Sequence, residues 1–136
     1  MLQVLQKAQA DGPETFAAAL DELNTQLGFC LDNGTVPPKT VTFQRRFVDA
    51  GGAEFCADLL AKGTETQRAW LALCHASIPV DNHLRIFAAT GLVQAAVQAM
   101  EAAVVPAIYV LANLAGSPQI SAKLAMFPGL CEAAVK

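Results

Sequence analysis

Charged side chains are scarce in this chain, and aromatic ones are scarcer. Only 15% of the 136 residues are charged and 7% are aromatic, with a single Trp and a single Tyr, and the formal net charge is −3. Without a basic excess the chain lacks the electrostatic surface that nucleic-acid binding requires, so we expect no nucleic acid among its partners. Arg45 and Arg46 form one adjacent basic pair, which we interpret as part of a solvated helix face.

The sequence also lacks motifs that carry catalysis or hold a metal. It contains no glycine-rich phosphate loop, no G-x-S-x-G and no H-E-x-x-H. Cys74 and His75 are adjacent, and neighbouring residues on a helix do not face each other, which argues against a nucleophile with its base. His75, His83 and the cysteines match no metal-ligand spacing. We therefore expect a protein that is not an enzyme, with no catalytic residue, metal or cofactor.

Paired cysteines and a secretory signal are missing as well. The N-terminus has no positive region followed by a long apolar run. No C-x-x-C pair occurs, and each cysteine has apolar neighbours, which predicts reduced thiols in the core. We expect a cytoplasmic or other reducing intracellular setting, which includes a large cytoskeletal or organellar assembly. The cysteines are Cys30, Cys56, Cys74 and Cys131.

One uncharged stretch, residues 102–122, is long enough to span a membrane. Pro106, Asn113 and Gly116 interrupt it, and its dense apolar part is shorter than the ~20 residues that a span needs. We therefore expect no membrane span.

What the chain has is a high apolar content, 54% of the residues, and a block marked by glycine that recurs. The block reads RRFVDAGGAEFCADLL around Gly52, LRIFAATGLVQAAVQAM around Gly91 and AKLAMFPGLCEAAVK around Gly129. The spacings are 91 − 52 = 39 and 129 − 91 = 38 residues. Self-similarity at this period is typical of stacked helical repeats, so the sequence predicts an all-α fold.

Apolar spacing and breaker residues place the helices. An apolar stripe predicts a long helix from Pro13, and Asn33-Gly34 and Pro37-Pro38 end it. A second stripe predicts a buried face on the helix at 102–115. Further helices are expected at 42–50, 53–61, 67–77, 83–89, 92–100 and 119–127. The first stripe is Phe16, Leu20, Leu23, Leu27 and Leu31; the second is Val104, Ile108, Leu111 and Ala115.

Each unit thus has a short helix, a glycine break, a middle helix and a longer inner helix. This order resembles the armadillo repeat family, and the strongest matches are AIYVLANLAGSP at Ala107–Pro118 and FVDAGG at Phe47–Gly52. HEAT repeats are the nearest competitor. The resemblance implies a right-handed α-solenoid of armadillo/HEAT-like repeats. Its parts would be a part-repeat at 1–34, a loop at 35–41, repeats at 42–80 and 81–118, and a truncated repeat at 119–136.

The resemblance also implies where a partner would bind. In peptide-binding armadillo proteins an inner-helix asparagine lines a concave groove, and an aromatic residue four positions earlier forms pockets. Asn113 and Tyr109 occupy those positions here. The preceding unit departs from the pattern, because it has His75 and Leu71 there. Arg68 completes the expected row. Trp70 aligns with Ile108 and is expected in the core.

These observations predict a non-catalytic scaffold that binds a protein or a peptide. A peptide-groove receptor and a structural brick of a larger assembly both remain open. The alternatives are a membrane-associated helical subunit of a complex and a regulatory domain of an enzyme. Both ends of the chain fall inside a repeat, so we expect further repeats or a neighbouring subunit to cover them.

Overall fold

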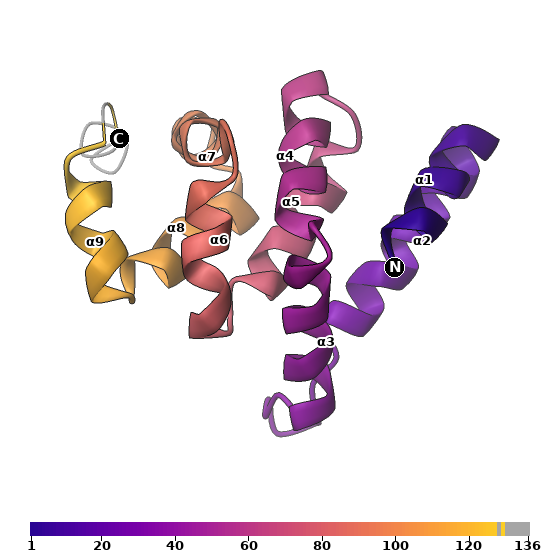
Figure 1. Ribbon diagram of the computed structural model, residues 1–136, viewed down its shortest axis with the longest axis horizontal. Helices are drawn as coiled ribbons and strands as arrows, with labels where there is room; N and C mark the ends of the chain where they lie inside the picture. The colour runs from indigo at the N-terminus through magenta and orange to yellow at the C-terminus, as the bar shows by residue number, and fades with distance from the viewer. Residues whose placement is uncertain (128, 130–136) are drawn as a thin grey trace.

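The chain folds into helices that are joined by short turns. The computed structural model describes residues 1–127 and Gly129. This part of the chain contains nine α-helices, one short 3-10 helix and no strand (Figure 1), which confirms the all-α prediction. The helices are α1 (Leu2–Asp11), α2 (Pro13–Leu27), α3 (Pro38–Asp49), α4 (Gly52–Lys62), α5 (Thr66–Ala76), η1 (Val80–Asn82), α6 (His83–Ala88), α7 (Leu92–Glu101), α8 (Val105–Ala115) and α9 (Pro118–Ala125).

Proline and glycine set many of the helix ends. A proline lies in the first turn of four helices, where its missing N–H costs no hydrogen bond. Gly51 and Gly91 precede α4 and α7 with φ angles of 100° and 77°. This left-handed conformation is accessible to glycine without steric cost. The four prolines are Pro13, Pro38, Pro106 and Pro118.

Two predicted helix starts are wrong. Helix α3 begins at Pro38 rather than at Thr42, because a proline is well suited to a first turn, so the predicted loop at 35–41 includes the start of this helix. Helix α8 begins at Val105 rather than at Ala102. Ala103 has a φ angle of 59° and Val104 is extended, which separates α7 from α8.

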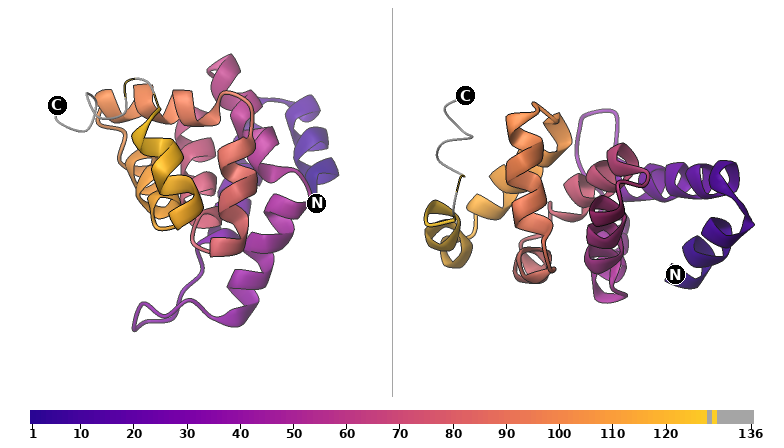
Figure 2. Two further views of the ribbon diagram at one scale, coloured as in Figure 1. Left: turned by 60° about the vertical axis from the view of Figure 1, so that its left-hand side comes forward. Right: turned by 90° about the horizontal axis from the view of Figure 1, so that it is seen from above.

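Three helices, α2, α5 and α8, form a row through the molecule that we call the inner row. Helix α2 packs on α5, and α5 packs on α8. Helices α3, α4, α6 and α7 contact this row, α1 packs on α2, and α9 packs on α8. The helices follow one another along the longest axis from α1 and α2 to α9 (Figure 1), and the turned views show the same succession (Figure 2).

The core runs along the inner row. Four of the five residues in the predicted α2 stripe are buried, but Leu31 is exposed because the helix ends at Leu27. Trp70 is only 4% exposed, which confirms its predicted core position. The second stripe is partly wrong. Leu111 is buried, whereas Ala115 and Ile108 are exposed, because among the described residues no further inner helix covers that side of α8.

Buried polar side chains connect successive units. Gln44 on α3 donates to the carbonyl oxygen of Leu27 at the end of α2, at 2.8 Å. Asn82 donates to the carbonyl oxygen of Ala76 at the end of α5, at 2.8 Å. A helix leaves its last carbonyl groups without partners inside the helix, so these bonds satisfy acceptors that burial would otherwise leave unpaired.

His83 extends this pattern, 83 − 44 = 39 residues after Gln44. Its Nε2 faces the carbonyl oxygen of Ser77 at 2.7 Å, and its Nδ1 faces the hydroxyl of Ser117. A carbonyl can only accept, so Nε2 carries a proton, and in the neutral ring Nδ1 then accepts from Ser117. This buried histidine therefore joins the ends of α5 and α8.

Candidate functional site

The five residues predicted to contact a partner lie on two neighbouring helices of the inner row. Arg68, Leu71 and His75 are on α5, and Tyr109 and Asn113 are on α8. The two helices pack against each other. The structure thus brings the predicted row onto adjacent elements, but its members differ in what already contacts them.

Asn113 is engaged within the fold. Its Nδ2 donates to the Ser77 hydroxyl at 2.8 Å, and that hydroxyl donates to the carbonyl oxygen of Cys74 at 2.8 Å. The amide therefore links α8 to the end of α5. Its oxygen makes no hydrogen bond within the described part of the chain, so one acceptor remains for a partner's N–H group.

His75 is half-buried where α5 meets α2. A Cβ atom at Gly28 would lie 2.5 Å from two atoms of the His75 ring, so the ring packs directly over the glycine backbone. Burial lowers the pKa of His75 below its ordinary value of 6.5. The imidazole is therefore neutral near pH 7 and offers one donor and one acceptor.

Arg68 is bound by two carboxylates. Its Nε donates to Asp21 of α2 at 2.8 Å, and one of its terminal nitrogens donates to Glu65 at 2.9 Å. The hydrogen bond from Arg68 lowers the pKa of Asp21, and the opposing effect of burial is smaller. A partner carboxylate would have to compete with these ion pairs, so Arg68 orders the α2–α5 contact rather than offering a free cation.

Tyr109 and Leu71 are the accessible members of the predicted row. Their exposed fractions are 56% and 38%, and no hydrogen bond is made by the Tyr109 hydroxyl within the described residues. Val105 and Ile108 lie beside Tyr109 on α8 and are also exposed. We call these three residues, Val105, Ile108 and Tyr109, the α8 apolar face.

Corresponding positions on α5 and α8 show why this face is open. The sequence alignment pairs Trp70 with Ile108, yet Trp70 is 4% exposed and Ile108 is 37% exposed. Helix α5 has α2 on one side and α8 on the other, whereas α8 has only α5 as an inner-row neighbour among the described residues. Among the described residues, the α8 apolar face therefore has no further inner-row helix packed against it.

One residue of the row was missed. Asn24 on α2 is buried, and its Nδ2 donates to the carbonyl oxygen of Arg68 at 3.2 Å, while its Oδ1 has no partner in the described part of the chain. Asn24 lies four residues before Gly28, and Asn113 lies three residues before Gly116. An asparagine near the end of an inner helix was the signal that could have identified it.

The cysteines differ from one another. Cys56 is buried, and burial raises the pKa of its thiol to about 12. Cys74 is partly buried and its pKa is also raised, which disfavours the thiolate that a nucleophile requires. Cys30 is exposed, so the expectation of a core position is wrong there. Cys131 lies outside the described residues. Within residues 1–127 and Gly129 no group of three metal-ligating side chains occurs.

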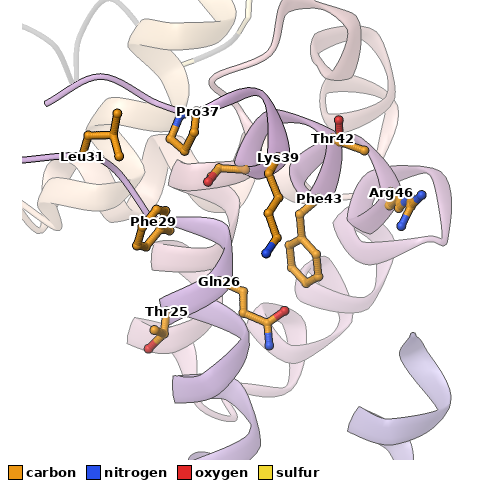
Figure 3. A pocket seen from close by; sticks show the side chains of 10 residues that line it. Thr25, Gln26, Phe29, Leu31, Pro37, Lys39, Thr42, Phe43 and Arg46 are labelled. Carbon is orange, nitrogen blue, oxygen red and sulfur yellow. The ribbon is translucent and has the colours of Figure 1, made fainter.

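A pocket of about 640 Å³ lies away from the five predicted contact residues, between the end of α2, the following loop and α3. Figure 3 shows Lys39 and Phe43 pointing from α3 toward Gln26 on α2. The loop contributes Phe29 and Leu31, which are exposed. Sequence reasoning missed this pocket because both of its edges were predicted wrongly. The structure ends α2 at Leu27, so Phe29 and Leu31 lie in the loop, and it begins α3 at Pro38, so Lys39 lies on that helix.

No family model, no curated protein and no solved structure matched this chain. None of the helices that the structure describes has the length and apolar character to cross a bilayer.

Proposed function

We propose that this protein is a non-catalytic scaffold for protein–protein interaction, built as a right-handed α-solenoid of armadillo-like units. The partner is a protein or peptide that lies along the inner row and contacts Tyr109, Leu71, His75 and the free acceptor of Asn113. The setting is intracellular and reducing, where the exposed Cys30 stays a thiol.

The observation that carries this proposal is the α8 apolar face. Large apolar side chains that gather on an exposed surface mark interaction sites, and Val105 and Tyr109 are each 56% exposed on one helix. Aromatic residues such as Tyr109 are enriched where protein interfaces bind most strongly, because the ring packs while the hydroxyl bonds. The unpaired acceptor of Asn113 lies next to this face.

Photo-crosslinking tests the proposal. A benzoyl-phenylalanine placed at Tyr109 in cells of the source organism should give discrete protein adducts, whereas the same group at Glu14, exposed on α2, should give none. Tyr109→Ala should then remove the same partners from a pull-down, while the free energy of unfolding changes by less than about 1 kcal/mol. An absence of adducts at Tyr109 would exclude the proposed surface.

Tyr109 is a better probe than Asn113, because Asn113→Ala also removes the bond to Ser77 and lowers stability by about 1 kcal/mol. Crosslinks confined to one extended segment of the partner would indicate a peptide-groove receptor. Crosslinks to a folded helical surface would indicate a structural subunit of a larger assembly.

A further inference from the structure

The pocket between α2 and α3 has a charge that differs from that of the whole chain. The chain carries a net charge of −3, yet the described residues that line the pocket include Lys39 and Arg46 and no acidic residue. The charge of this pocket is therefore suited to an anionic group.

These two cations also lack partners within the fold. Arg45, Arg68 and Arg85 each form an ion pair with a carboxylate, at 3.1, 2.8 and 3.0 Å. In the part of the chain that the structure describes, no carboxylate lies within ion-pair distance of Lys39 or Arg46. Their charges are available to a ligand without breaking an internal contact.

An apolar side chain lies between the two charges. Lys39, Phe43 and Arg46 are spaced four and three residues apart, so they share one face of α3. The step of seven positions from Lys39 to Arg46 spans about 10 Å along the helix axis. The loop adds Phe29 and Leu31, which are 55% and 48% exposed (Figure 3 shows their place beside the pocket).

We propose that this pocket binds an acidic, apolar peptide segment of a partner protein, with carboxylates at Lys39 and Arg46 and an apolar side chain against Phe43. The site extends the proposed function, because it adds a second contact surface at the α2–α3 junction, separate from the α8 apolar face. Its test does not depend on Tyr109.

Two features disfavour other anions. Pro38 opens α3 and removes an N–H group from the helix terminus, which weakens the usual backbone site for a phosphate. Two cations are also fewer than the four to eight that typically direct a segment to an anionic membrane. The apolar lining and the spacing of the charges favour a peptide.

Selection from a random library of 12-residue peptides, displayed on phage and panned on the intact chain, tests the proposal. Selected peptides should carry acidic residues on both sides of an apolar one. In fluorescence anisotropy, Lys39→Gln or Arg46→Gln should weaken their binding about tenfold, as expected for the loss of a charge-assisted hydrogen bond.

The matched control is Arg45→Gln, which removes the same charge one position away on α3, where the side chain pairs with Asp81 outside the pocket. It should change the affinity less than twofold. The proposal is overturned if no acidic, apolar peptide is enriched, or if the selected peptides bind the Arg46→Gln chain as tightly as the unchanged one. Binding to phosphatidylserine vesicles or to inorganic phosphate that needs both cations, without peptide binding, would also overturn it.

Discussion

The two ends of the inner row present different surfaces. Helix α1 packs on α2, buries Leu5 and Ala8, and turns mostly polar side chains outward, although Val4 is 69% exposed. At the other end, α8 exposes large apolar side chains. Stacked repeats need a polar outer face at their ends to stay soluble. The comparison shows that α1 covers one side of α2, so we call α1 the cap of α2, whereas the described residues leave large apolar side chains of α8 uncovered.

The largest effect is expected from a matched pair on α5 and α8. Trp70→Ala should lower the free energy of unfolding by about 3–5 kcal/mol, because it empties a covered position. Ile108→Ala, at the corresponding position of the open helix, should cost less than about 1 kcal/mol. Urea unfolding followed by circular dichroism measures both. Equal losses would show that α8 is as well covered as α5.

A second pair tests the cap. Leu5→Ala should lower stability by about 2–3 kcal/mol, since Leu5 is 3% exposed and fills the contact between α1 and α2. Val4→Ala on the same helix should change it by no more than about 0.5 kcal/mol. Hydrogen exchange should show faster opening of α1 in the Leu5 variant. If the two variants lose the same stability, the contact between α1 and α2 does not stabilise the row.

The smallest effect concerns pH at the α2–α5 contact. Burial lowers the pKa of His75 in the folded chain, so the unfolded chain binds a proton more readily. Stability should therefore fall as pH drops below 6.5, the ordinary value, and level off below the folded-state pKa. His75→Gln should flatten this dependence.

NMR titration of the imidazole sharpens the comparison between the two ends. In the Leu5→Ala chain the pKa of His75 should rise toward 6.5 if a loosened cap admits water to the contact. A pKa that stays unchanged in that variant would mean that the cap does not protect this part of the row.

The helices and much of the core were predictable from the sequence. Apolar spacing identified the buried face of α2, and the alignment of Trp70 with Ile108 identified a core position. The burial predictions that failed concern positions whose exposure depends on a neighbouring helix. Ile108 has an apolar side chain in a correct helical phase, and only the absence of a covering helix among the described residues leaves it exposed. Periodicity describes which side of a helix is apolar, not what lies against it.

For the candidate site too, the sequence predicted helix positions but not the contacts between helices. The sequence indicated which helices carry the row, but not that Arg68 is held by Asp21 and Glu65 or that Asn113 bonds to Ser77. Such contacts join residues far apart in the chain, so no local pattern reports them. The α2–α3 pocket was hidden for a related reason, because Pro38 suggested a break rather than the start of a helix.

The bond from Gln44 to the last turn of α2 has a consequence for synthesis on the ribosome. The carbonyl group of Leu27 receives its donor from a residue 17 positions later, and that of Ala76 receives its donor from Asn82. The hydrogen bond to the last turn of an inner helix can therefore form only after the later residue that donates it has emerged from the ribosome. Translation speed just after each inner helix should influence how long its end stays frayed, and so how readily the nascent chain engages chaperones.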